Sequence, residues 1–425
     1  LQIIMFKANK HRIENHIESL ARFTSTPGHG ATRLSYSKED AAARHYIKQE
    51  MNNLGLVVRE DAVGNIYGRM EGALKNAPAV IIGSHFDSVP NGGSFDGPAG
   101  IVTGLEVVAL FRDYGFEPQY PLEVIAMIEE EGSRFGGGVL GSRMIAGQIT
   151  LVDLNEMKDN TGLSAAEAME KMGFNAAEIG SAQRTGKDVK AFLELHIEQG
   201  PLLEAAAQDV GIVEMIVGMT EIRITVKGKS GHAGTTPMEG RADALAGAVS
   251  ILKELPGMVL DEPDRPVLTV GKLNVLPNGA NVIPNQVTFT VDIRSAHSDT
   301  IQRILQKIEQ LVADVKIPGI SFSTEELLYA EPVEMSADIQ TLLIENCEKL
   351  GLRYRKMVSG AGHDAMIFAD FTETGLIFVP SKDGISHTPE EWTDYAQLQK
   401  GIEVAFETIV QLTEAKEKSS NTETY

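Results

Sequence analysis

The sequence predicts an α/β protein in which a large layered domain is interrupted by a smaller α+β domain. The length of 425 residues exceeds what one hydrophobic core usually organises. Apolar runs alternate with helical patterns over the first half, which is typical of a central sheet flanked by helices. After Gly211 the pattern becomes β–α–β–β–α–β, and the alternating α/β character returns from about Ala330. We therefore expect a discontinuous domain of residues 1–212 and 330–425, and a second domain of residues 213–329.

The elements of the large domain follow one another in a regular order. Residues 10–55 carry apolar side chains at helical spacing, and the runs LVVRED, NIYGRME, AVIIGSH and PLEVIAMI follow as strand candidates. A helix is expected from about Gly100 to Tyr114, and KAFLELHIEQG at 190–200 adds another strand. Because helices cover both faces of such a sheet, the central strands should be buried.

The smaller domain has a pattern of its own. EMIVGMTEIRITVKGKSGHAG alternates as a strand does, RADALAGAVSILKEL has helical spacing, and VLTVGKLNVLPNGANVIPNQVTFTVDIRS contains two or three strands. The helical pattern TIQRILQKIEQLVADV and the strand GISFSTEELLY complete the segment. This order of elements predicts a ferredoxin-like α+β sandwich.

Composition excludes several classes of partner and site. The net charge is −21, from 38 basic and 59 acidic residues, which argues against nucleic acid and anionic membranes as partners. A single cysteine, Cys347, excludes intrachain disulfides and thiolate-rich metal sites, and its helical surroundings indicate core packing. No apolar run has the length of a membrane span, and the opening LQIIMF is too short for a signal peptide, so we expect a cytoplasmic protein.

Histidines and carboxylates follow the predicted strands, where ligands collect in α/β sheets. A lone histidine after a strand is usually an ordinary polar residue, and an acidic run is usually a solvated surface. Four such groups together favour a metal site, since imidazole and carboxylate suit Zn²⁺, Mn²⁺, Co²⁺ or Ni²⁺. The four groups are His85, Asp87 and Asp96; Glu129–Glu131; LHIEQ at 195–199; and GISHTPEEW at 384–392.

Seven ordered motifs carry a resemblance to a known family: GSHFDSVPNGGSFDGPAG, EEEGSRF, LELHIEQG, GHAGTTPM, GANVIP, SGAGHDA and GISHTPEEW. The chain resembles the metal-dependent amidohydrolases of the aminoacylase/carboxypeptidase (peptidase M20) superfamily, in the branch of allantoate amidohydrolase and N-carbamoyl-L-amino acid hydrolase. The resemblance runs from ATRLSYS to the last helical pattern. It implies a metallopeptidase-like catalytic domain with a central mixed sheet, and an inserted lid and dimerisation domain.

The resemblance also implies a site with two divalent cations, Mn²⁺ or Zn²⁺, with Co²⁺ and Ni²⁺ as alternatives. Glu130 would be the general base, and Asp87 would orient the imidazole of His85. The implied ligands are Asp96 bridging both cations, His85 and His196 on one cation, and Glu131 and His387 on the other.

Further residues are implied to bind the substrate. His232 would stabilise a developing oxyanion, in the catalytic centre of a partner subunit of a homodimer, although by itself it is an ordinary turn residue. Arg294 would hold the substrate carboxylate by a bidentate fork, or would form a salt bridge at the edge of a strand. His363 would line the pocket or orient its loop. The remaining predicted contacts are Gln199, Asn281 and Gly360.

The expected substrate is a small anionic ureido compound. SGAGHDA and EPVEM favour allantoate, with N-carbamoyl-L-amino acids second and ureidoglycolate or β-ureidopropionate third. A peptidase and a binding protein that has lost catalysis are further alternatives. The presence of Glu130 and of all five implied ligands argues against the binding protein.

Overall fold

The computed structural model describes residues 6–414, so most of the opening LQIIMF lies outside the described part of the chain. The chain divides into two compact units. The larger unit contains the residues up to Glu214, Met335–Met357, and those from Gly362 on. The smaller unit contains Met215–Glu334 and a short return segment, Val358–Ala361, which lies within the range expected for the large domain.

The larger unit contains most of a nine-stranded mixed sheet with the order β1-β2-β4-β3-β5-β13-β6-β11, in which β12 also pairs with β6. The four central strands, β4, β3, β5 and β13, run parallel to one another, whereas β2 and β6 pair antiparallel with them. This confirms the expected mixed α/β sheet. The strands are β1 (Val57–Glu60), β2 (Ile66–Met70), β3 (Ala79–His85), β4 (Leu122–Met127), β5 (Val189–Ile197), β6 (Val210–Ile216), β11 (Val333–Glu334), β12 (Tyr354–Ser359) and β13 (Glu373–Val379).

Helices flank this sheet and bury its central strands. Their bounds are α1 (Lys10–Ala21), α2 (Lys38–Asn53), α3 (Pro98–Tyr114), α4 (Leu140–Ile145), α5 (Leu151–Glu156), α6 (Ala165–Lys171), α7 (Leu202–Ala205), α10 (Ala337–Lys349), α11 (Asp364–Phe368) and α12 (Tyr395–Thr413), with 3₁₀ turns at Ala176–Ala182 and Lys382–Gly384. Cys347 is buried in α10, as its helical surroundings predicted.

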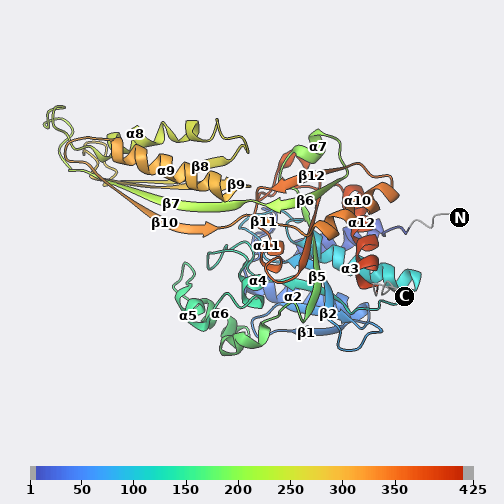
Figure 1. The fold of residues 1–425 in the computed structure, drawn as a ribbon. Coiled ribbons are helices and arrows are strands. Elements are labelled where there is room, and N and C mark those ends of the chain that lie inside the picture. Colours follow the sequence, from blue (N-terminus) through green and yellow to red (C-terminus); the bar gives the residue numbers. More distant parts are fainter. Residues whose placement is uncertain (1–5, 415–425) are drawn as a thin grey trace, which may run out of the picture. The chain divides into compact units, whose positions relative to one another are not determined.

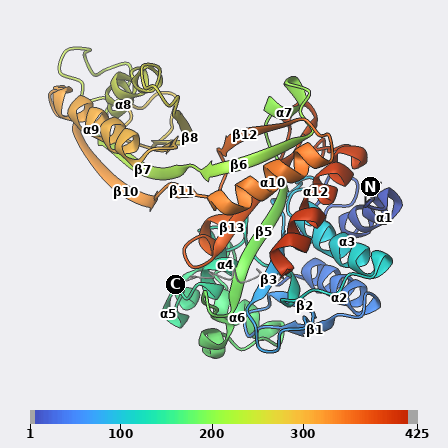
Figure 2. The same ribbon diagram turned by 45° about the vertical axis from the view of Figure 1, so that its right-hand side comes forward.

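The side-chain alternation of β5 shows how two faces of the sheet are covered. Phe192 stacks on Phe368 of α11, with ring centroids 4.0 Å apart. On the opposite face Leu195 packs so closely on α12 that a Cβ at Gly401 would lie 2.9 Å from its Cδ1. Helices α3 and α12 accordingly lie on one side of β5, and α4 and α11 on the other (Figures 1 and 2). Successive side chains of a strand point to opposite faces, so the polar residues at the end of β5 also have fixed directions.

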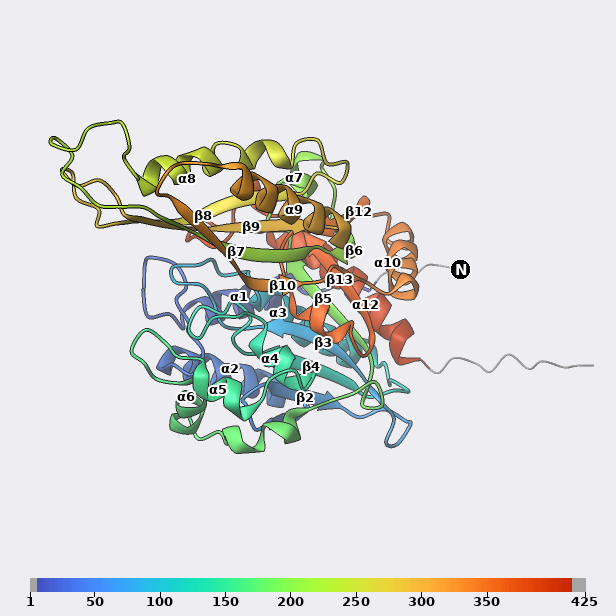
Figure 3. The same ribbon diagram turned by 60° about the vertical axis from the view of Figure 1, so that its left-hand side comes forward.

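The smaller unit has a four-stranded antiparallel sheet with the order β10-β7-β9-β8. The burial of β7 alternates residue by residue, so one face of this sheet is covered and the other is not. Helices α8 and α9 cover that one face (Figure 3). The strands and helices follow in the order expected from the sequence: β7 (Gly218–Lys227), α8 (Ala244–Leu252), a 3₁₀ turn at Leu255–Met258, β8 (Val267–Leu276), β9 (Gln286–Ser295), α9 (Ser298–Asp314) and β10 (Ser321–Ala330).

Among the residues that the structure describes, no helix is both long enough and apolar enough to cross a membrane.

Candidate functional site

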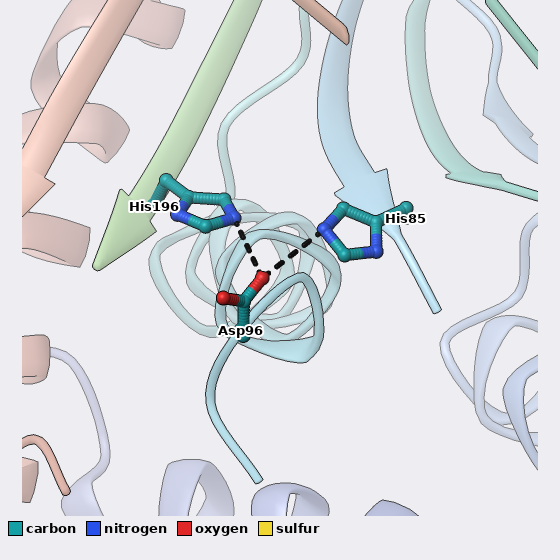
Figure 4. Close-up of side chains that lie close together, drawn as sticks. All are labelled: His85, Asp96 and His196. Carbon is teal, nitrogen blue, oxygen red and sulfur yellow. Dashed lines mark ion pairs between the residues drawn. The ribbon is translucent and has the colours of Figure 1, made fainter. Parts of the chain in front are cut away.

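Three of the predicted ligands meet where two parallel strands end. His85 is the last residue of β3, and His196 lies near the end of the neighbouring strand β5. Asp96 comes from the loop that leads into α3. Both imidazoles point toward the same carboxylate oxygen (Figure 4). His85 Nε2 lies 3.4 Å and His196 Nε2 lies 3.3 Å from Asp96 Oδ1.

A second group of predicted ligands lies around the other oxygen of Asp96. His387 Nε2 lies 3.3 Å from Asp96 Oδ2 and 3.5 Å from Glu131 Oε2. The side chain of His387 is 46% exposed, whereas those of His85 and His196 are 1% and 2% exposed. The structure therefore brings all five predicted ligands together, with the second group open to solvent on the side of His387.

Each histidine presents Nε2 to this centre. The Nδ1 atom of His196 lies 3.0 Å from the carbonyl oxygen of Ile197, and that of His85 lies 3.2 Å from the carbonyl oxygen of Asp87. A proton on each Nδ1 donates to these acceptors, which leaves the Nε2 lone pairs directed at Asp96. The local backbone thus fixes the tautomer that a metal ligand needs.

Asp87 supports the site in a second way that the sequence did not indicate. Its Oδ1 lies 3.4 Å from His85 Nδ1, as expected for a group that orients the imidazole. The same carboxylate accepts the main-chain N–H groups of Glu130 at 3.0 Å and Glu131 at 3.2 Å. Asp87 therefore fixes the histidine and the acidic loop relative to one another.

Burial and mutual repulsion perturb the acidic groups of the site. Burial raises the pKa of Glu131 to about 7, and the charge of Asp96 adds to the rise. Burial also raises the pKa of Glu130 well above its usual range, against the attraction of His85 and with the repulsion of Glu131. Glu130 Oε2 lies 3.7 Å from His85 Nε2. Several buried carboxylates so close together favour a cation among them.

Gln199 contacts the second ligand group directly. Its Nε2 donates to Asp96 Oδ2 at 2.7 Å and lies 3.2 Å from His387 Nε2. Gln199, His387 and Glu129 all have positive φ angles, of 57°, 60° and 49°. Non-glycine residues adopt this left-handed conformation rarely, and they concentrate at functional sites when they do. The strained positions fall in three of the four groups that the sequence singled out.

His363 is a buried neighbour of the first ligand group. It precedes α11, and its ring lies 4.5 Å from that of His196 and 5.4 Å from that of Phe378. Burial lowers the pKa of His363 well below its usual value, so the ring is neutral near pH 7. Packing against a predicted ligand fits its expected place near the site.

Two predicted substrate contacts lie side by side in the smaller unit. His232 and Val282 form an isolated β-bridge, and the Ala233 N–H donates to the carbonyl oxygen of Asn281 at 3.0 Å. His232 is exposed, and its Nδ1 accepts the N–H of Gly234 at 3.1 Å. The neutral ring therefore carries its proton on Nε2, which is a donor available to a ligand.

Arg294 has partners of its own in the smaller unit. Its Nε donates to Asp292 Oδ1 at 3.0 Å, and its Nη1 donates to the carbonyl oxygen of Gly360 at 2.9 Å. This is the strand-edge salt bridge that was the alternative to carboxylate binding. A ligand carboxylate bound by Arg294 has to compete with Asp292.

Three buried carboxylates near the site lie within motifs quoted above, but the sequence indicated no role for them. Glu391 accepts main-chain N–H groups from the loop that carries Asp96. Glu194 accepts the Ser84 hydroxyl at 2.6 Å, and Asp364 accepts the Ser142 hydroxyl at 2.6 Å. Burial raises the pKa of Asp364 to about 8. A signal existed for Glu194, because a charged residue two positions before His196 in an apolar strand shares its face.

The fold and the site together define a class. A mixed α/β sheet carries clustered histidines and carboxylates at the ends of its parallel strands, in groups that could hold metal ions. This is the arrangement of a metal-dependent hydrolase.

Comparison with known proteins assigns the chain to one family within this class. The sequence pattern of Peptidase family M20/M25/M40 matches residues 81–411, and the chain belongs to this family, whose members depend on metal. It is 44% identical over 399 residues to an N-carbamoyl-L-amino-acid amidohydrolase of Paenarthrobacter aurescens, covering 94% of this chain and 97% of that protein. It is 37% identical over 404 residues to the allantoate amidohydrolase of Bacillus subtilis, covering 95% and 98%.

A solved structure has the same fold over almost the whole chain. The crystal structure of an amidase of the hydantoinase/carbamoylase family from Burkholderia multivorans matches with a TM-score of 0.85 and 34% identity, covering 96% of this chain and 98% of that one. The resemblance drawn from the motifs is thereby confirmed. The chain is a hydrolase of C–N bonds other than peptide bonds.

Proposed function

We propose that the larger unit binds two divalent cations and hydrolyses a ureido C–N bond in a small substrate that carries a carboxylate. One observation carries the proposal: the two oxygens of Asp96 face separate groups of ligands. Oδ1 faces His85 and His196, and Oδ2 faces His387. A carboxylate in this position suits a bridge between two cations.

The donor atoms fit a pair of cations. His85 Nε2 and Glu131 Oε1 are buried and have no hydrogen-bond partner among the described residues. Buried polar atoms are normally satisfied, so these two atoms point to a bound group. Imidazole and carboxylate ligands suit Mn²⁺ or Zn²⁺, and they also accept Co²⁺ or Ni²⁺. When bound, two such cations polarise a carbonyl oxygen and acidify water.

Glu130 is proposed as the general base. It lies beside the ligand Glu131 and faces the first ligand group, with Oε2 3.7 Å from His85 Nε2. There it takes a proton from the attacking water and returns it to the leaving nitrogen, a contribution of about 10²–10⁴-fold in rate. Asp87 holds the main chain of this acidic loop and thereby fixes the direction of Glu130.

Other residues are proposed to bind the substrate. His232 donates from Nε2 to the developing oxyanion, in a homodimer in which this residue serves the partner subunit. Arg294 exchanges its bond to Asp292 for one to the substrate carboxylate, and Asn281 supports the same group. Gln199, Gly360 and His363 complete the proposed pocket.

Two substrates are proposed, each on a specific observation. The segments SGAGHDA and EPVEM favour allantoate. The identity of 44% to the Paenarthrobacter aurescens protein favours N-carbamoyl-L-amino acids. Both substrates place a terminal ureido group near a carboxylate, so one site chemistry serves either.

A substrate panel tests the proposal. The protein is loaded separately with Mn²⁺ and Zn²⁺ and incubated with allantoate and with N-carbamoyl-L-methionine, and ammonia release is measured. A dipeptide panel, followed by release of free amine, covers the peptidase alternative. Ammonia from either ureido compound supports the proposed reaction and names the substrate. Turnover of dipeptides alone would contradict it.

A further inference from the structure

Glu391 connects two distant loops that each carry a predicted ligand. It is 4% exposed, and its Oε1 accepts the N–H groups of Phe95 at 2.9 Å and Asp96 at 3.1 Å. Its Oε2 accepts the N–H of His387 at 3.4 Å. One buried carboxylate therefore binds the main chain of both Asp96 and His387.

The two ligand groups are supported in different ways. His85 pairs with Met127 in the ladder of β3 and β4, and His196 pairs with Phe378 in the ladder of β5 and β13, so the sheet fixes both main chains. Asp96 and His387 lie outside the strands and helices, so no ladder fixes them. His387 also has a φ of 60°, a conformation that needs support from its surroundings. The bonds to Glu391 supply support to both loops.

The glycine loop is shaped to admit this carboxylate. A Cβ at Gly93 would lie 2.0 Å from Glu391 Oε1 and 2.4 Å from its Cβ. No side chain tolerates such a contact, so residue 93 has to be glycine while Glu391 occupies its present position. The hydrogen bonds of Glu391 therefore depend on the absence of a side chain at residue 93.

We propose that Glu391 is a positioning residue that fixes the main chains of Asp96 and His387, so that their side chains meet at the second cation position. The inference rests on the proposed metal centre, and it assigns Glu391 neither a ligand nor a base role. Its effect should be larger on the group of Asp96, Glu131 and His387, where it supports two of the three ligands, than on the group of His85, His196 and Asp96, where it supports Asp96 alone.

The test compares Glu391→Gln with Glu390→Gln, a matched control at the exposed neighbouring position. In Glu391→Gln one carboxylate oxygen becomes an amide donor, which faces a main-chain N–H and cannot accept from it. Titration with Mn²⁺, followed by the electron paramagnetic resonance signal of free Mn²⁺, gives the two binding constants. We expect one of the two association constants to fall about 10–100-fold, the other to fall by clearly less, and Glu390→Gln to match the unchanged protein.

A second measurement needs no metal. Hydrogen–deuterium exchange of the metal-free protein reports on the N–H groups that Glu391 accepts. Exchange at the N–H groups that face the new amide, either those of Phe95 and Asp96 or that of His387, should become faster in Glu391→Gln and stay unchanged in Glu390→Gln. In Gly93→Ala the added methyl group displaces the carboxylate of Glu391. This variant should reproduce both effects, and it replaces Glu391→Gln in the test if that variant does not fold.

The outcomes separate this inference from the proposed metal centre. If the unchanged protein does not bind two Mn²⁺ ions, the metal centre fails, whatever the exchange data show. If it binds two, unchanged constants and unchanged exchange in both variants overturn the role of Glu391. An equal loss at both cation positions would also overturn it, because Glu391 supports two ligands of the second group and only one of the first.

Discussion

Two replacements of Asp87 test its role as the acceptor of main-chain N–H groups separately from the effect of its charge. Asp87→Ala leaves the main-chain N–H groups of Glu130 and Glu131 without their acceptor. A buried donor left unpaired costs about 1–3 kcal/mol, so two cost about 2–6 kcal/mol of stability. Asp87→Asn keeps one carbonyl oxygen as an acceptor, and should cost about half as much.

Removing the charge of Asp87 also has a stabilising effect, which opposes the cost of the lost acceptor. Comparing the two variants cancels this effect of charge. Burial raises the pKa of Glu129 to about 7 and the charge of Asp87 adds to the rise, so removing that charge relieves repulsion. Both variants gain this relief equally. The difference between them isolates the lost acceptor, and we expect Asp87→Ala to be less stable than Asp87→Asn by about 1–3 kcal/mol.

The single tryptophan provides the assay. Trp392 packs edge-on against Phe95 at 5.3 Å, next to the site. Its fluorescence during urea unfolding, with a chelator present, reports the free energy of unfolding of the larger unit. Equal unfolding midpoints for the two variants would refute the role of Asp87 in holding the acidic loop. Both variants should also bind Mn²⁺ about 10–100-fold more weakly, because His85 Nδ1 loses its carboxylate neighbour.

Three further predictions concern catalysis, pH and substrate binding. Glu130→Gln should lower kcat about 10²–10⁴-fold while the metal content by elemental analysis stays unchanged, and an active variant would remove Glu130 from its role. Burial lowers the pKa of His16 to about 4, so the unfolded chain binds more protons between pH 6.5 and pH 4. The contribution of His16 to stability should therefore fall by about 2 kcal/mol from pH 7 to pH 5, measured as the difference between the unchanged protein and His16→Gln in urea unfolding at each pH. Arg294→Lys loses the bidentate fork and should raise KM about 10–100-fold with kcat little changed; an unchanged KM would leave Arg294 with its salt bridge to Asp292 alone.

The fold could be predicted from the sequence where local patterns decide it. The apolar run before His85 and the alternation of β7 reflect burial on two faces and on one face of a sheet, which is a local property. The boundary of the smaller unit was harder, because Val358–Ala361 joins that unit by a long-range contact. There Val217 donates to the carbonyl oxygen of Ser359 at 3.0 Å.

From the sequence, only the histidines and carboxylates of the ligand type could be predicted as members of the site. His85, Asp96 and His196 stand out because histidines and carboxylates at strand ends have few ordinary uses. Glu391 did not stand out, since its partners are main-chain N–H groups of a loop far away in the chain. The salt bridge of Arg294 was foreseen as an alternative, but the choice depends on the conformation of Asp292. Partners of this kind are set by tertiary packing, which no local pattern contains.

The unequal exposure of the two ligand groups has a kinetic consequence. His85 and His196 are sealed from solvent, whereas nearly half of the His387 side chain is accessible. Two cations held here would exchange with solution at different speeds, the one at His387 first. A brief exposure to a chelator would then leave a half-loaded protein, and a second metal added afterwards would give a defined mixed-metal enzyme. The order of loading would then decide which metal occupies which ligand group.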